Sequence, residues 1–160
     1  LSFLGRYSAG IFAESAAEIP AFDPVNKRIF IVNAQKGAVD VLDATDPANP
    51  TLIDTLTAAD VAADAVVNSI AYKGGYLAVA IEASPKTDNG FVALYDATTL
   101  ELLGSAQGGP QPDMLTFSPD GQYLLTANEG EPSNDYSVDP VGSISILSLT
   151  DDDIDRIEDD

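Results

Sequence analysis

The sequence contains no cysteine and no histidine, and only 7 of its 160 residues are basic. Without cysteine, no disulfide can form. Without histidine, the Ser-His-Asp and Cys-His catalytic arrangements are excluded, and the usual ligands of zinc and copper are missing. A metal ion bound by this chain would therefore be a hard, oxygen-preferring cation such as calcium or magnesium.

The scarcity of basic residues leaves the 26 acidic residues largely uncompensated, and the formal net charge is −19. Because nucleic-acid phosphates are neutralised by clustered Lys and Arg, we expect no nucleic-acid binding, and anionic membrane surfaces are disfavoured for the same reason. No apolar run approaches the roughly 18 residues of a membrane span, so no membrane insertion is expected in this segment. The acidity suits cations as ligands or a salty extracellular setting, and it would also simply keep a protein soluble.

What is present is a repeat. Hydrophobic residues make up 45% of the chain, enough for one domain with a core. A pattern of short apolar segments recurs, and its third segment starts at Gly37, Gly90 and Gly142, which lie 53 and 52 residues apart. A four-stranded antiparallel unit that repeats every 40 to 50 or so residues is typical of a β-propeller blade. A β-sandwich, the alternative, would not require the same strand order three times.

We therefore predict an all-β fold in which residues 1–149 form about three four-stranded antiparallel blades of a larger β-propeller ring. The blades span approximately 18–58, 68–107 and 113–149, and the fourth strand is visible only in the first two. Residues 1–17 predict an outer strand followed by a loop, and the chain, which starts at Leu1 rather than Met, is expected to be a mature or excised piece.

The last ten residues contain seven acids and one arginine, so residues 150–160 are interpreted as an acidic tail or linker. Three blades do not close a ring, since propellers have typically four to eight. We expect the remaining blades to lie outside this chain. They belong either to sequence not included here, which we favour, or to another chain that combines with this one.

Polar residues recur at strand ends that a propeller would bring to one mouth of its central channel. The first strand of each blade lines the channel, and the loop joining strands two and three opens on the same face. These loops lengthen along the chain, from 34–36 through 83–89 to 129–141, and insertions on one face usually mark the functional face. The predicted channel-mouth polar ring comprises Glu18, Asn33, Asn68, Glu82 and Asn128.

Carboxylates gathered at such a mouth repel one another unless a cation or a proton intervenes. A calcium ion would resolve this repulsion, since it prefers carboxylate, amide and backbone oxygens. The alternative is a wet mouth whose polar groups only bind water or cap strand ends. No nucleophile is identifiable, so catalytic residues are unknown, and Lys36 and Lys86 are the only plausible phosphate-binding residues. The candidate metal ligands are Asp113, Glu129, Glu131, Asp135 and Asp139.

Several motifs resemble those of the choice-of-anchor I family. They are Ala17-Glu18-Ile19, Val39-Asp40-Val41-Leu42-Asp43, Asp46-Pro47-Ala48-Asn49-Pro50, Asn68-Ser69-Ile70-Ala71, Pro112-Asp113-Met114, Ser118-Pro119-Asp120-Gly121, Ala127-Asn128-Glu129-Gly130-Glu131-Pro132 and Asp139-Pro140-Val141-Gly142-Ser143-Ile144-Ser145-Ile146. The family comprises bacterial surface or secreted propellers similar to the animal mesenchyme-specific cell-surface glycoprotein, and some members are described as atypical alkaline phosphatases. The resemblance spans roughly residues 3–149, the N-terminal portion of such a propeller. One departure is Val141, which stands where members usually have Glu.

The resemblance implies export, to an extracellular, cell-surface or periplasmic location. Together with the residue pattern it predicts a binding or scaffold module for a protein or surface ligand, with a calcium site at the acidic channel mouth. The alternative is part of a calcium-dependent, alkaline phosphatase-like phosphomonoesterase, and whether the protein is an enzyme stays open.

Overall fold

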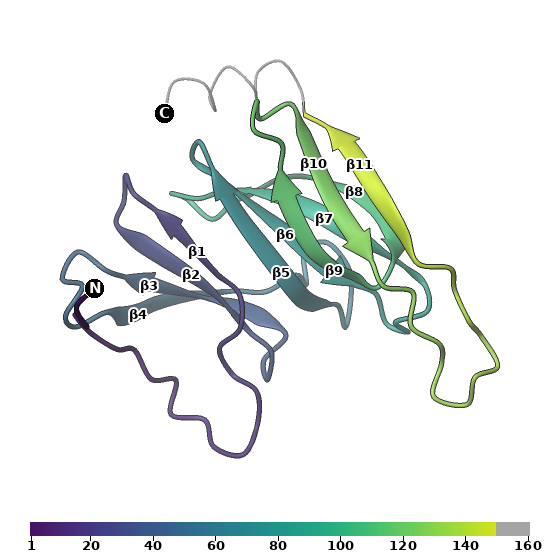
Figure 1. Cartoon of the computed structure of the whole chain (residues 1–160), viewed down its shortest axis with the longest axis horizontal. Coiled ribbons are helices and arrows are strands. Elements are labelled where there is room, and N and C mark those ends of the chain that lie inside the picture. Colours follow the sequence, from purple (N-terminus) through teal and green to yellow (C-terminus); the bar gives the residue numbers. More distant parts are fainter. Residues whose placement is uncertain (150–160) are drawn as a thin grey trace.

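The computed structural model describes residues 1–149, in which eleven strands form three antiparallel sheets and no helix occurs. Each sheet is a propeller blade, and the three blades stand side by side (Figure 1). This confirms the all-β, partial-propeller prediction. Blade 1 contains β1 (Pro20–Asp23), β2 (Arg28–Asn33), β3 (Ala38–Asp43) and β4 (Thr51–Leu56). Blade 2 contains β5 (Val66–Lys73), β6 (Tyr76–Glu82), β7 (Asn89–Asp96) and β8 (Leu102–Pro110), and blade 3 contains β9 (Pro112–Phe117), β10 (Tyr123–Asn128) and β11 (Ser143–Ser148).

The hydrophobic core lies between the blades rather than within one of them. Each blade presents one face to its neighbour, so alternate residues of a strand enter different inter-blade layers. Blade 2 has a neighbour on both sides, and β6 is therefore buried along almost its whole length. The layer between blades 1 and 2 contains Phe30, Val32, Val39, Val41, Val67, Ile70, Leu77, Val79, Ile81, Ala93 and Tyr95, and the layer between blades 2 and 3 contains Tyr76, Ala78, Ala80, Val92, Leu94, Leu115 and Leu124.

Acidic residues at strand ends close the turns of the blades. The carboxylates of Asp43 and Asp96, at equivalent positions in blades 1 and 2, accept hydrogen bonds from the backbone N–H two residues on, at 2.8 Å in both cases. In the predicted tight turn of blade 3, Asp120 accepts from the backbone N–H of Gln122 at 3.1 Å, and Gly121 adopts a φ of 73°. These side chains favour turns because they satisfy backbone donors locally. Part of the chain's acidity is therefore structural.

The N-terminal segment differs from the prediction. Residues 1–17 contain no strand, so the expected outer strand is wrong. The segment has glycines at positions 5 and 10 and a run of small residues, and thus offers no continuous alternating face to pair. It instead passes the turn between β3 and β4, where a Cβ on Gly5 would lie 2.2 Å from the carbonyl oxygen of Pro47. The predicted acidic tail lies outside the described residues.

Candidate functional site

The loops that follow β2, β6 and β10 all open on one face of the blades, because the strands of each sheet are antiparallel and in the same order. The β10–β11 loop is the longest of them and projects beyond the sheets (Figure 1). We call this side the loop face. It is the face on which the sequence places most of the candidate site residues.

An ion pair joins the second and third of these loops. The Lys86 ammonium lies 2.6 Å from Oε2 of Glu131, across 45 residues of sequence. Gln111, the single residue between β8 and β9, strengthens the connection: its amide nitrogen donates to Oε2 of Glu129 and its amide oxygen accepts from the backbone N–H of Glu131, both at 3.2 Å. These contacts hold Glu129 and Glu131 of the β10–β11 loop close to blade 2.

Further carboxylates surround this ion pair. Partial burial raises the pKa of Glu129, and the negative charges of Asp113, Glu131 and Glu82 raise it further. The hydrogen bond from Lys86 lowers the pKa of Glu131 and, reciprocally, raises that of Lys86. We call these five residues the Lys86 cluster: Glu82, Lys86, Asp113, Glu129 and Glu131.

Asn68 connects the cluster to the first strands of the blades. Its side-chain nitrogen donates to Oε2 of Glu82 and to the carbonyl oxygen of Pro112, both at 3.1 Å. Of the predicted polar ring, Asn68 and Glu82 therefore lie together, and three of the candidate metal ligands, Asp113, Glu129 and Glu131, lie near them where blades 2 and 3 meet.

The other two candidate ligands are elsewhere in the β10–β11 loop. Asp135 accepts hydrogen bonds from the hydroxyls of Ser133 and Ser137, both at 2.7 Å, and these bonds lower its pKa to about 2. Asp139 is exposed further along the loop. In residues 1–149, no group of three or more acidic side chains is arranged to hold a metal ion. Hydrogen bonds already engage three of the five candidates: Gln111 donates to Glu129, Lys86 to Glu131, and two serine hydroxyls to Asp135.

The remaining predicted ring residues make contacts outside the Lys86 cluster. Asn33 and Asn128, at the ends of β2 and β10, are both buried. Asn128 donates to the hydroxyls of Ser143 at 3.1 Å and Ser145 at 2.9 Å, on the adjacent β11. Glu18 is exposed, and its backbone N–H donates to the carbonyl oxygen of Val32. At these strand ends the asparagine side chains point along the sheet toward the third strand.

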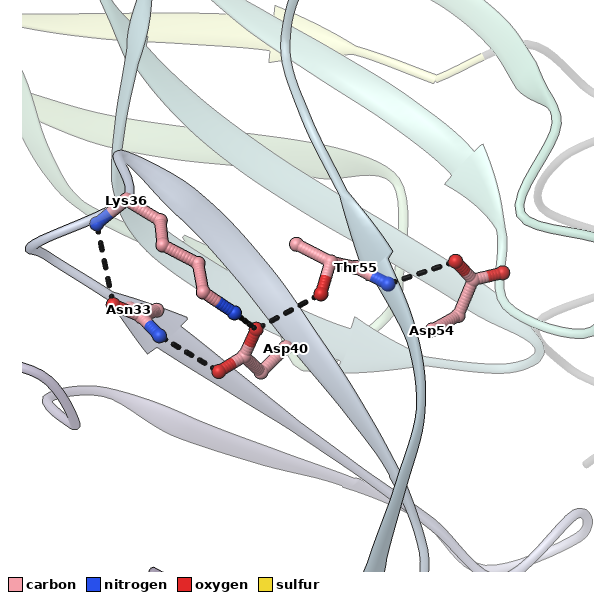
Figure 2. A network of polar contacts seen from close by, with 5 residues as sticks. All are labelled: Asn33, Lys36, Asp40, Asp54 and Thr55. Atoms are coloured by element: carbon pink, nitrogen blue, oxygen red, sulfur yellow. Dashed lines mark hydrogen bonds and ion pairs between the residues drawn. The ribbon is translucent and has the colours of Figure 1, made fainter. Parts of the chain in front are cut away.

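Asn33 belongs to a buried polar network in blade 1 (Figure 2). Asp40 is only 3% exposed and accepts hydrogen bonds from Asn33 at 2.7 Å, Lys36 at 2.9 Å and the Thr55 hydroxyl at 3.0 Å. Burial acts to raise the pKa of Asp40, but the three hydrogen bonds and the Lys36 charge outweigh it, and the pKa lies below its usual value. The sequence analysis did not predict this network. The available signal was the close spacing of Lys36 and Asp40, which lie four residues apart on either side of Gly37. Both candidate phosphate-binding lysines thus have carboxylate partners.

A shallow groove lies between the β6–β7 and β10–β11 loops. Two adjoining cavities, of about 290 and 420 Å³, share Lys86, Ser133 and Asn134 in their walls. Tyr136 lines the smaller one, is largely exposed, and has a left-handed backbone with φ of 57°. A left-handed conformation is uncommon for a bulky residue and persists only where its surroundings fix it. Here the Ser133–Asp135–Ser137 hydrogen bonds do so.

The blades and the loop face together define the chain as part of a β-propeller. The family model of the choice-of-anchor I domain matches residues 18–159, and the chain belongs to this family. No curated protein matches it.

Solved structures share its fold at low sequence identity. Hydrazine synthase from Kuenenia stuttgartiensis is 20% identical with a TM-score of 0.62, and the match covers 82% of this chain and 34% of that one. A luciferin-regenerating enzyme is 17% identical with a TM-score of 0.63, covering 84% and 45%. Sqt1 from Saccharomyces cerevisiae is 12% identical with a TM-score of 0.59, covering 87% and 33%. The chain thus spans less than half of each of these three solved chains, and the likeness concerns the fold alone.

Proposed function

We propose that this chain is the ligand-binding part of an extracellular β-propeller scaffold, with the loop face as its binding surface. Membership of the choice-of-anchor I family supports the proposed location. In residues 1–149 there is no helix long and apolar enough to cross a membrane. The further blades that a ring requires come from outside these residues.

The observation that carries the proposal is that Tyr136 is exposed on a loop whose conformation is already fixed by hydrogen bonds. Tyrosine offers a large contact area at low entropic cost and is enriched at binding hot spots. Its loop is held before any ligand arrives, by Asp135 from within and by the Lys86–Glu131 ion pair at its base. Preorganisation of this kind reduces the cost of ordering a loop on binding. The groove beside the ring, lined by Lys86, Ser133 and Asn134, offers polar contacts to a protein or surface ligand.

Photo-crosslinking tests this function. A photoreactive phenylalanine analogue is placed at Tyr136 and, in a matched variant, at Val25, an exposed residue of the β1–β2 turn on the opposite face. After irradiation with the surface fraction of the producing cells, we expect a discrete crosslinked product from position 136 only. Unlabelled wild-type protein should suppress it, whereas a Tyr136→Ala competitor should not. Equal products from both positions would show that the loop face is not a specific binding surface.

The Lys86 cluster supports calcium as a ligand of the same face. Burial raises the pKa of Glu129 and the like charges around it raise it further, so a cation would stabilise the ionised cluster. In the structure Lys86 supplies that positive charge. A calcium ion would compete with Lys86 for Glu129 and Glu131, and Asp135 would not contribute while its serine hydrogen bonds remain.

Calorimetry with calcium chloride tests this second proposal. We expect heat of binding and a higher melting temperature for the wild type, loss of both in Glu129→Gln/Glu131→Gln, and tighter binding in Lys86→Ala, which removes the competing ammonium. An Asp54→Asn control, at an exposed acid of blade 1, should bind as the wild type does. Absence of heat in both the wild type and Lys86→Ala would mean that the cluster is a solvated, lysine-neutralised surface.

No contact among the described residues favours the phosphomonoesterase alternative. Phosphate binding would need a free cationic group at the loop face, and Lys36 and Lys86 are each held within 3 Å of a carboxylate oxygen, at 2.9 and 2.6 Å.

A further inference from the structure

A second hollow lies on the loop face, where the connection between blades 1 and 2 meets the β6–β7 loop. Its volume is about 440 Å³, which falls within the range of small-ligand sites. It shares no residue with the groove beside Tyr136, which lies between the β6–β7 and β10–β11 loops. The two hollows are therefore separate candidate sites on one face.

Phe91 provides the aromatic wall of this hollow. It lies at the start of β7, and its side chain packs against the core layer between blades 1 and 2. Because Phe91 is only half-buried, part of its side chain stays open to a ligand while the core contacts hold it in place. Ala62 and Ala63, in the connection between β4 and β5, line the hollow with small side chains. An apolar surface is thus fixed before any ligand arrives.

Four polar side chains line the same hollow: Ser84, Asp88, Asn89 and Gln107. All four are exposed, and none of these side chains donates or accepts a hydrogen bond within the described part of the chain. Gln107 is the partner of Phe91 in the β7–β8 pairing, which places an amide beside the aromatic wall. The two amides and the hydroxyl each donate and accept, whereas the carboxylate only accepts. A ligand could therefore form several hydrogen bonds here without breaking any that the chain already makes.

The charges around the hollow disfavour an anionic ligand. Among its wall residues Asp88 alone is charged, and the sequence has no lysine or arginine between Lys36 and Lys73, the stretch that contains the β4–β5 connection. Asp60 and Asp64 in that connection add negative charge, so phosphate, sulfate and carboxylate groups would be repelled. A cation would meet one carboxylate, whereas calcium takes several oxygen ligands. The hollow therefore suits an uncharged ligand.

We propose that this hollow binds a sugar unit of a neutral glycan. A pyranose ring carries C–H groups on its faces, which stack on aromatic side chains, and hydroxyl groups around its edge, which both donate and accept hydrogen bonds. The hollow presents matching groups: the side chain of Phe91 for the face of the ring, and the amides of Asn89 and Gln107 for its hydroxyls. The inference goes beyond the function proposed for the groove beside Tyr136, and either can fail without the other.

Binding of the 160-residue chain to an array of oligosaccharides tests the proposal. The neutral set contains gluco-, manno-, galacto- and xylo-oligosaccharides, and the acidic set contains polyuronates and sulfated oligosaccharides. We expect binding to members of the neutral set only, and calorimetry with the best-bound oligosaccharide then gives the affinity of each variant. Asn89→Ala/Gln107→Ala should weaken binding by about tenfold or more, because two hydrogen-bonding amides are lost. Phe91→Leu should weaken it by about threefold to tenfold, because leucine is apolar but has no aromatic face.

Two further variants control for effects elsewhere. Gln122→Ala removes an exposed amide from the β9–β10 turn on the opposite face, and Tyr136→Ala alters the other groove, so both should bind the oligosaccharide as the wild type does. Circular dichroism and the melting temperature should show that every variant is folded. A folded wild type that binds no neutral oligosaccharide, or binds the acidic set equally well, would overturn the proposal. So would unchanged affinity in Asn89→Ala/Gln107→Ala, or loss of binding in Tyr136→Ala alone, which would place the glycan in the other groove.

Discussion

Asp40 is a buried carboxylate that receives hydrogen bonds from three donors of its own blade (Figure 2). An apolar residue stands at the equivalent position of blade 2, Ala93, so blade 1 could have been built without a charge here. A buried acceptor that is fully satisfied fixes its neighbours, whereas removing it leaves the donors unpaired.

We therefore expect Asp40→Ala to destabilise the chain by about 1–3 kcal/mol, because the amide of Asn33 and the hydroxyl of Thr55 would lose their acceptor. Urea unfolding measures this change. Asp54→Ala is the control: Asp54 is exposed and accepts only the backbone N–H of Thr55, so its loss should change stability by no more than about 0.5 kcal/mol. Equal effects of the two substitutions would contradict a structural role for the network.

The same carboxylate predicts a pH dependence. The pKa of Asp40 in the folded chain lies below its unfolded value of 3.8, so the unfolded state binds the proton more tightly. Its stabilisation is therefore complete above that value and is lost as the pH falls through the lower, folded pKa. The stability difference between wild type and Asp40→Asn should shrink between about pH 5 and pH 2. Urea unfolding at each pH measures this difference. If it stayed constant over this range, the ionised carboxylate of Asp40 would not stabilise the fold more than asparagine does.

At the level of elements, β8 shows how closely blades 2 and 3 approach. A Cβ on Gly109 would lie 2.7 Å from both the amide nitrogen of Asn128 and the hydroxyl of Ser143, whereas a Cβ on Gly104, in the same strand, meets nothing within 4 Å. If such a Cβ displaced Asn128, its amide nitrogen would lose its hydrogen bonds to the hydroxyls of Ser143 and Ser145, and its amide oxygen is already buried without a partner among the described residues.

Gly109→Ala should accordingly destabilise the chain by about 1–3 kcal/mol through overpacking. Gly104→Ala is the matched control, and it should be neutral or stabilising by up to about 1 kcal/mol, because alanine restricts the unfolded chain and meets no obstacle in the fold. Thermal unfolding of both variants measures the difference. If Gly109→Ala were as stable as Gly104→Ala, blades 2 and 3 would have to separate more easily than the close contact indicates.

For the molecule as a whole, the net charge of −19 opposes the compact state through self-repulsion. Added salt screens this repulsion, since the Debye length falls from about 30 Å at 0.01 M to about 3 Å at 1 M. The two ion pairs of the described residues are screened too, but they are few against the excess of acids.

We expect the melting temperature to rise by about 2–4 °C, equivalent to about 1 kcal/mol, between 0.01 and 0.5 M sodium chloride. Differential scanning calorimetry over this range measures the effect, and the same salt dependence in Lys36→Met/Lys86→Met would show that the ion pairs do not cause it. A melting temperature that falls with salt would mean that attractive pairs outweigh the general repulsion.

The blade architecture could be predicted from the sequence, because burial imposes its period directly on the chain. The glycines at 37, 90 and 142 mark equivalent strands of the three blades, the continuous apolar run of β6 reflects a blade covered on both sides, and the alternation of β11 reflects one covered on a single side. The tight turn at Asp120 and Gly121 also followed from local chemistry.

Which polar residues contact one another could not be read from the sequence. Asn33, Glu82 and Asn128 occupy equivalent strand ends, yet Glu82 joins the Lys86 cluster while the two asparagines are buried against their third strands. The residues that make the difference, Asp40, Gln111 and Lys86, lie elsewhere in the sequence. The position of a residue in its strand places its Cα in the blade. The partner of its side chain depends on loops of different length that approach from the neighbouring blade.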